Sequence, residues 1–395
     1  MKFWRRSLPV RSPWRGWQGI RNLLIAGGLG MGLGNCGTGQ PPNPGDNSPV
    51  ASPQGDPLRV VVTANVLCEV TAALLGVKPS FASPPAEPSS AIGAGLGSQP
   101  MDLHCLLDPF QDPHTYQPTP SDRRALADAD LILYGGYGLE ASFIQLLQAT
   151  TTATPPVPVY ELAVPNPLPA TEDNHSHGHG DSDPVAPAED DHGHGDEDPH
   201  IWHRADYGAA IVATVAQQLI PLTSGDVAGR STALQQQLLD LHQWIQAQTN
   251  TIPSPQRYLI TTHDAFRYFG QAYGVQTLGI LDGLNPSQKP SAATLADLAE
   301  TVRRAGVPMV FPEVTSNGEL LRTVAQTAGV QVAPQPLWVE GVIASESPTD
   351  PPMATPGAFS YSAMLVANTC EIVTGLGGQC DRSTLPPSVL DPKLP

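Results

Sequence analysis

Short apolar runs alternate with amphipathic stretches along most of the chain. The β-branched run Leu58–Ala64 is typical of a buried strand, and Asp226–Gln248 repeats apolar residues at the spacing of one helix face. That face comprises Leu234, Leu238, Leu241 and Ile245. Further strands are predicted at Met101–Leu107, Leu131–Tyr134, Val157–Tyr160, Tyr258–Thr262, Gln276–Ile280, Met309–Phe311 and Val330–Ala333. Further helices are predicted at Val66–Gly76, Ser121–Asp130, Leu139–Ala149, Ala205–Ile220, Ala265–Tyr273, Ser291–Ala305, Gly318–Ala328 and Ser360–Thr374.

Alternating strands and helices are typical of parallel α/β layers. We therefore predict two parallel-sheet α/β lobes, residues 58–222 and 253–380, joined by one long helix within 223–252 and followed by a tail, 381–395. The stretch 164–199 interrupts the pattern, because it holds six Pro, ten acidic residues, five His and no Lys or Arg. Such a composition buries too little apolar surface to order itself, so we predict a disordered loop there.

The first residues of the chain have the pattern of a secretory signal. Residues 1–21 are basic and lack acids, the apolar run Leu23–Leu33 is too short for a stable membrane span, and Leu33-x-x-Cys36 resembles a lipobox. We therefore predict a lipoprotein-type signal peptide over 1–35 with Cys36 lipidated; ordinary cleavage nearby and an uncleaved anchor are the alternatives. The polar stretch 36–57 is predicted to be a flexible tether.

Export would place the remaining cysteines in an oxidising compartment. They are Cys68, Cys105, Cys370 and Cys380, which allow three pairings that the sequence alone does not distinguish. We favour Cys68–Cys105 and Cys370–Cys380, because each pair then lies within one predicted lobe.

The net negative charge of the chain favours cations over nucleic acids as ligands. The chain carries 37 acidic and 20 basic residues, a formal net charge of −17. Nucleic-acid binding is therefore not expected, since neutralising phosphates requires Lys and Arg, whereas an acidic surface suits cations.

The histidines fall into two groups. One lies in the acidic loop and comprises His175, His177, His179, His192 and His194. Imidazoles in a flexible acidic segment can bind Zn²⁺, Cu²⁺ or Ni²⁺, so we expect accessory, exchanging metal contacts there. The other group, His114, His200 and His263, lies beside predicted strand or helix ends, where ligands of open α/β sheets bind.

Three strings around these isolated histidines carry a family resemblance. They are D-P-H-T-Y-x-P-T-P-S-D at Asp112–Asp122, D-P-H-x-W at Asp198–Trp202 and T-x-H-D-A-F-x-Y-F-x-x-A-Y-G at Thr261–Gly274. In this order, and with a His-rich insertion between the first two, the chain resembles the metal-specific solute-binding proteins of zinc and manganese ABC importers (ZnuA/TroA-like).

The resemblance implies one metal ligand from each of four loops, two in each lobe. Matched string by string, these are His114, His200, His263 and, in P-L-W-V-E-G-V, Glu340. Manganese-type members typically carry Glu at the third position, so His263 favours zinc, which imidazole suits better. The fourth ligand is usually Asp; Glu340 either binds the ion itself or leaves the position to water. Three His and one carboxylate would form a tetrahedral zinc site.

Several further residues lie near these ligands in the sequence. Glu313 and Asp264 are expected to lie behind the ligands, where a carboxylate can orient a ligating imidazole. Asp112, Asp198 and Asp264 neighbour the histidines in sequence, and helix capping explains them equally well. His203 follows His200 by three residues but lies outside the matched string.

The resemblance implies capture of Zn²⁺ outside the cytoplasm and delivery to an ABC permease and its ATPase. We expect a non-enzymatic monomer in the periplasm or on the outer face of a bacterial membrane, held by a lipid anchor. Manganese or mixed-metal binding, and a His-rich zinc-buffering or adhesin lipoprotein, are the alternatives. A zinc hydrolase is disfavoured, because neither H-E-x-x-H nor G-x-S-x-G occurs.

Overall fold

The computed structural model describes residues 57–77, 80–81, 101–108, 110–152, 154–170, 196–280, 290–316, 318–341 and 360–389, with 80–81 and 360 described by their backbone alone. These residues all belong to one unit, Pro53–Pro395. The predicted signal peptide, Cys36, residues 36–56 of the predicted tether and the five loop histidines lie outside the described residues.

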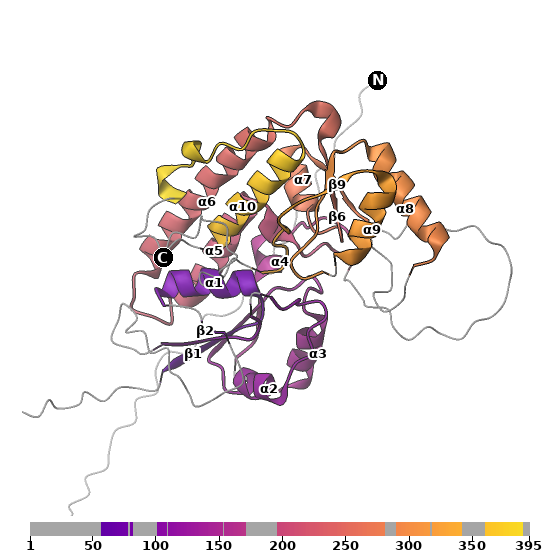
Figure 1. The fold of residues 1–395 in the computed structure, drawn as a ribbon. Helices are drawn as coiled ribbons and strands as arrows, with labels where there is room; N and C mark the ends of the chain where they lie inside the picture. Colours follow the sequence, from indigo (N-terminus) through magenta and orange to yellow (C-terminus); the bar gives the residue numbers. More distant parts are fainter. Residues whose placement is uncertain are drawn as a thin grey trace, which may run out of the picture. The chain divides into compact units, whose positions relative to one another are not determined.

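The N-terminal lobe is built on a parallel sheet of five strands in the order β2-β3-β1-β4-β5 (Figure 1). The strands are β1 (Leu58–Val62), β2 (Ser80–Phe81), β3 (Met101–Cys105), β4 (Leu131–Tyr134) and β5 (Val157–Pro158). The short strand β2 is not among the strands predicted from the sequence. In the centre of the sheet Val62 lies opposite both Cys105 and Leu133, so three strands end side by side.

The sheet is covered by helices on both faces, which explains the apolar runs Val60–Val62 in β1 and Leu131–Leu133 in β4. Val60 and Val62 pack into the core that includes α1 (Asn65–Leu75) and α5 (Ala205–Leu219). Val61, on the opposite face, packs with residues of α2 (Pro120–Ala127) and α3 (Ala141–Ala149). Successive side chains of β1 therefore pack into two separate cores, because side chains alternate between the two faces of a strand.

The predicted strand Val157–Tyr160 is wrong in its second half. β5 ends at Pro158, and α4 (Val159–Ala163) begins at the next residue. The reason is the sheet itself, because Pro158 already lies opposite Tyr134, the last residue of β4. With no ladder partner left, the chain turns and buries Val159 and Tyr160 instead.

The C-terminal lobe repeats the parallel α/β arrangement with shorter strands. β6 (Tyr258–Thr261) pairs with β7 (Gln276–Gly279), and β8 (Met309–Val310) pairs with β9 (Gln331–Val332). A single parallel bridge between Thr261 and Phe311 joins the two pairs. The helices are α7 (Arg267–Tyr273), α8 (Ala292–Ala305), α9 (Glu319–Ala328) and α10 (Ser360–Gly375).

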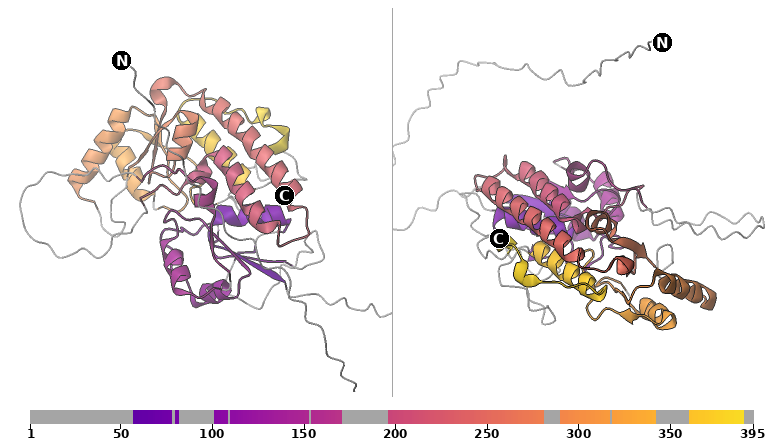
Figure 2. Two further views of the ribbon diagram at one scale, coloured as in Figure 1. Left: turned by 180° about the vertical axis from the view of Figure 1, so that it is seen from behind. Right: turned by 90° about the horizontal axis from the view of Figure 1, so that it is seen from above.

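The long helix predicted at Asp226–Gln248 is confirmed as α6 (Val227–Thr249). Asp226 caps it, since its Oδ1 accepts the amide hydrogen of Gly229 at 2.9 Å. Helix α6 packs against α5 and α10, which run beside it in the views of Figure 2. Short 3₁₀ turns complete the fold: η1 (Ile201–His203), η2 (Ser254–Gln256), η3 (Arg382–Thr384) and η4 (Pro387–Val389). Within the described ranges, no helix combines the length and apolar character that a membrane span needs.

The two ends of the predicted disordered loop are ordered in the structure. Pro169 forms an antiparallel bridge with Glu197, and the amide of Asp198 donates to the carbonyl of Leu168 at 2.8 Å. The Tyr268 hydroxyl, from α7, accepts from the Leu168 amide and donates to the Asp198 carbonyl, both at 2.9 Å. The ends of this segment are therefore ordered by backbone pairing and by the Tyr268 side chain, although their composition is polar.

Both favoured disulfides are present. Cys68 of α1 is bonded to Cys105 at the end of β3, and Cys370 of α10 is bonded to Cys380. The two bonds close chain segments of very different length, with sequence separations of 37 and 10.

This difference predicts unequal contributions to stability. Loop-closure entropy gives about 4 kcal/mol for the longer segment and about 3 kcal/mol for the shorter one. The Cys68→Ala/Cys105→Ala variant should therefore unfold at lower urea concentration than Cys370→Ala/Cys380→Ala. Equilibrium urea unfolding of both variants and the parent tests this; a larger loss from the C-terminal pair would contradict it.

Candidate metal centre

The predicted ligands lie at or just beyond the carboxyl ends of strands, or at the start of a turn. His114 lies in the loop after β3, His263 lies two residues beyond the end of β6, and Glu340 lies in the loop after β9. His200 immediately precedes η1. Parallel strands end at one edge of a sheet, so loops from both lobes can converge there.

The two Asp-Pro-His strings fold in the same way. The Asp112 carboxylate accepts the amide hydrogen of His114 at 2.8 Å, and the Asp198 carboxylate accepts that of His200 at 3.0 Å. Each aspartate thus closes a tight turn onto the residue two positions later. The intervening proline fixes one backbone angle, so the imidazole leaves the loop in a defined direction.

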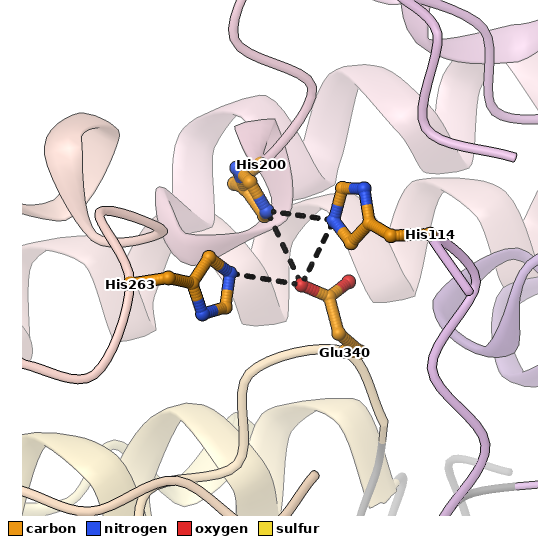
Figure 3. Close-up of side chains that lie close together, drawn as sticks. All are labelled: His114, His200, His263 and Glu340. Carbon is orange, nitrogen blue, oxygen red and sulfur yellow. Dashed lines mark hydrogen bonds and ion pairs between the residues drawn. The ribbon is translucent and has the colours of Figure 1, made fainter. Parts of the chain in front are cut away.

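The structure brings the four predicted ligands together, with one ligand atom of each within 4.8 Å of the others (Figure 3). The Nε2 atoms of His114, His200 and His263 lie 3.4, 3.2 and 3.5 Å from Glu340 Oε1. The Nε2 atoms of His114 and His200 are 3.2 Å apart. The Glu340 side chain is 1% exposed and that of His263 is 32% exposed, so His263 is the ligand whose side chain is most accessible to solvent.

The four distances just given fit the edges of a tetrahedron around a metal ion, and the remaining two, from His263 to the other imidazoles, are no longer than 4.8 Å. A tetrahedron whose arms are about 2.0–2.1 Å long has edges of about 3.3 Å. Moreover, within the described part of the chain, both carboxylate oxygens of Glu340 and the Nε2 of His263 are buried without a well-formed hydrogen bond. Buried polar atoms are normally satisfied, so the approach of the three Nε2 atoms to the unsatisfied Oε1 of Glu340 indicates a site for a cation.

Charge coupling dominates the electrostatics of the cluster. Burial disfavours the charged form of His200, but the Glu340 and Asp198 carboxylates outweigh it and raise the pKa of His200 to about 9. Burial likewise opposes ionisation of Glu340, but His200 and His114 hold the pKa of its carboxyl well below the usual range. Without a metal, the cluster is therefore held by a proton on an imidazole facing a carboxylate.

Carboxylates lie behind two of the three imidazoles. Asp198 Oδ1 accepts from Nδ1 of His200 at 2.8 Å, and Glu313 Oε2 accepts from Nδ1 of His263 at 2.7 Å. Each bond holds a hydrogen on Nδ1, so that once the imidazole is neutral its Nε2 lone pair faces the cluster. Asp264 lies elsewhere: its carboxylate accepts from Thr277 and is 3.6 Å from Nε of Arg267.

His203 and Trp202 contact the main chain of Val339, the residue before the ligand Glu340. The His203 ring stacks on Phe266 with ring centroids 4.3 Å apart, and its side chain hydrogen-bonds the main chain of Val339. Burial, helped by the charge of His200, lowers the pKa of His203 to about 3. Trp202 Nε1 donates to the Val339 carbonyl at 2.8 Å. His203 is thus a neutral packing residue next to Glu340 and lies outside the four-residue cluster.

Two parallel α/β lobes with a buried His and Glu cluster define an α/β solute-binding protein whose site suits a metal cation. A family model described as "ZnuA: Zinc-uptake complex component A periplasmic" matches residues 86–375. Because the match spans well over half of the chain, the protein belongs to this family. The resemblance and the α/β fold class predicted from the sequence are thereby confirmed.

Relatives and solved structures agree with this assignment. Manganese-binding lipoprotein MntA of Halalkalibacterium halodurans is 29% identical over 269 residues, covering 67% of this chain and 78% of that protein. Zinc-binding protein TroA of Treponema pallidum is 29% identical over 283 residues, covering 70% and 82%. The structure of that periplasmic zinc-binding protein superposes with a TM-score of 0.61 at 23% identity, covering 82% of this chain and 99% of TroA. This likeness establishes the fold.

Sequence reasoning left two residues of the site without a firm role. Asp198 was indistinguishable from Asp112 and Asp264, because all three neighbour a histidine in sequence. Asn65 was not singled out, although it lies just beyond the end of β1, where the rule for open α/β sheets places ligand loops. Its amide contacts the main chain of two ligand loops.

The carboxylates behind the imidazoles should tune metal affinity. Asp198→Asn and Glu313→Gln keep the side-chain shape but remove the charge, so each should weaken Zn²⁺ binding about 10–100-fold. Competition titration against a chelator measures this effect. Glu300→Gln, on the exposed face of α8, is the control that should bind like the parent; wild-type affinity in both test variants would contradict the assigned roles.

Metal binding should release protons. The pKa of His200 is about 9 without metal, so its imidazole is protonated at neutral pH and must become neutral to bind. Burial lowers the pKa of His263, but Glu313 and Glu340 outweigh burial and raise that pKa well above its usual value, so this imidazole must lose a proton as well. Zn²⁺ affinity should therefore rise at least about tenfold per pH unit from neutral pH. Calorimetry in buffers of different ionisation enthalpy counts the released protons, and an affinity independent of pH would refute the coupling.

Proposed function

We propose that this protein captures Zn²⁺ outside the cytoplasm and delivers it to the permease of an ABC-type importer. The observation that carries the proposal is the cluster of His114, His200, His263 and Glu340, which brings three imidazoles and one carboxylate, the donors of a tetrahedral zinc site, within 4.8 Å of one another. The family is a component of zinc uptake described as periplasmic, a role in solute binding and not in catalysis. The metal is therefore cargo, held without an open position for a reacting water.

Zinc is favoured over manganese by the donor atoms. Three imidazoles and one carboxylate suit the borderline-soft Zn²⁺, whereas Mn²⁺ prefers oxygen donors and a higher coordination number. The names of the relatives do not decide the matter, because MntA is named for manganese and TroA for zinc. A manganese or mixed-metal carrier is the alternative proposal.

Delivery requires that the ion be released as well as bound. His114 and His200 come from the N-terminal lobe, and His263 and Glu340 come from the C-terminal lobe. A small shift of one lobe would therefore separate two ligands from the other two. The contacts of α6 with α5 and α10 favour such a limited shift over a wide opening. A lipid on Cys36 would keep the monomer beside its permease.

The His-rich loop is proposed to gather ions near the site. Its histidines lie within 171–195, between Leu168 and Asp198, which are hydrogen-bonded to each other. Deleting the loop as far as Asp198 would remove the carboxylate behind His200. An informative deletion therefore replaces 171–195 with a short Gly/Ser linker and keeps Asp198.

Competition titrations with Zn²⁺ and Mn²⁺ test the proposed function. The parent and the loop-deleted protein should each retain one tight zinc site that manganese does not displace. Loss of all tight binding with the loop would refute the four-residue site and leave a His-rich buffer. Equally tight manganese binding would support the manganese alternative.

Replacing one imidazole by a carboxylate should move the metal preference. His263→Glu adds an oxygen donor, so the ratio of Zn²⁺ to Mn²⁺ affinity should fall at least about tenfold. His242→Glu changes a histidine outside the cluster, on α6, and should leave that ratio unchanged. An equal change in both variants would show that added negative charge, and not coordination, sets the preference.

A further inference from the structure

Asn65 lies where the two lobes meet behind the metal cluster. It is the first residue of α1 and is 2% exposed. Its Nδ2 lies 3.4 Å from the carbonyl oxygen of Gln111 and 3.5 Å from that of Glu340. Gln111 lies three residues before the ligand His114, and Glu340 is itself a ligand. One side-chain amide therefore contacts a ligand loop of each lobe.

Hydrogen bonds within the N-terminal lobe hold the segment around Gln111, so its main chain and the ligand that follows are linked. The Gln111 amide donates to the Asp108 carbonyl at 3.0 Å, and the Gln111 side chain accepts from the Asp108 amide at 3.0 Å. The next turn begins at Asp112 and holds the amide of His114. A displacement of the Gln111 carbonyl would therefore carry His114 with it.

The segment before Glu340 is held in a similar way. Asn368 of α10 forms two hydrogen bonds with the main chain of Trp338. Its Nδ2 donates to the Trp338 carbonyl at 2.6 Å, and its Oδ1 accepts from the Trp338 amide at 2.9 Å. Trp202 donates to the Val339 carbonyl. Asn65 continues this series by one residue, onto the carbonyl of the ligand itself.

Helix α1 is fixed to the His114 side of the cluster. Cys68, almost one turn along α1 from Asn65, is bonded to Cys105, the last residue of β3 before the His114 loop. The amide of Asn65 therefore reaches the C-terminal lobe from a position that is covalently tied to the N-terminal one.

The chemistry of Asn65 argues against a role in fold stability alone. Within the described residues, its buried Oδ1 has no hydrogen-bond partner. An unsatisfied buried oxygen destabilises a fold, so an apolar side chain would serve packing better. Only the two donor hydrogens of the amide are used, one for each ligand loop.

We infer that Asn65 is a positioning residue that holds the His114 loop and the Glu340 loop at metal-binding separation. The inference rests on the proposed function, since it concerns the same four ligands. Holding ligands in place before the ion arrives raises affinity, because less of the binding free energy is spent on ordering them.

Asn65→Leu keeps the approximate volume and removes both donors. It should weaken Zn²⁺ binding about tenfold, as the loss of two modest hydrogen bonds predicts. The melting temperature of the metal-free protein should not fall in parallel, because the orphaned oxygen is removed as well. Thr71→Val is the matched control on the same helix: it removes a buried hydroxyl that donates to the Leu67 carbonyl and should leave zinc affinity unchanged.

A double-mutant cycle separates positioning from a general effect. In a Glu340→Ala background, Asn65→Leu should cause little further loss of zinc affinity, since the ligand that it positions is gone. Equal losses in both backgrounds would overturn the inference, as would wild-type affinity of Asn65→Leu. If Asn65→Leu does not fold, Asn65→Ser, which is too short to span both carbonyls, provides the same comparison. Absence of a tight zinc site in the parent would instead refute the proposed function.

Discussion

Burial of the Glu340 carboxylate is the constraint on which the arrangement of the site depends. An isolated carboxylate with 1% side-chain exposure would be costly, so positive charge must meet it. Without metal, a proton on a neighbouring imidazole supplies that charge; with a divalent ion, the imidazoles become neutral and the ion supplies it. Both states require the same convergence of side chains, which is why the metal-free geometry already brings the four ligands together.

The two lobes meet this requirement by the same structural means. Parallel strands direct loops to one edge, and each loop is then fixed by local hydrogen bonds. Asp198 and Glu313 each take the Nδ1 hydrogen of an imidazole, so that Nε2 offers its lone pair inward. The cluster is thus built in layers: ligand, carboxylate, and main chain held by residues such as Trp202 and Asn65. Loss of an outer layer changes affinity without removing a ligand.

Local patterns predicted most of the elements, because helix and strand periods are properties of neighbouring residues. Helix α6 and strand β4 lie where the pattern places them. The second half of Val157–Tyr160 was mispredicted, since the end of a strand depends on a partner distant in sequence. The ligand set could be proposed only through the family resemblance, because His114, His200 and His263 have no local metal-binding spacing. The roles of Asp198 and Asn65 depend on contacts across the fold, which no local pattern contains.

The backbone pairing of Leu168 and Pro169 with Glu197 and Asp198 lies at the two ends of the acidic insertion. Because of this pairing, the length of the insertion has little effect on the geometry of the site. The insertion begins after Leu168 and ends before Asp198. These two residues are hydrogen-bonded to each other and to the Tyr268 hydroxyl. The entropy of closing a loop grows only logarithmically with its length, so each doubling costs about 0.6 kcal/mol. Added residues therefore change little at His200, although the insertion ends two residues before it. A reporter domain whose termini lie close together could be inserted between Leu168 and Asp198. It would lie near the metal site without disturbing the four ligands.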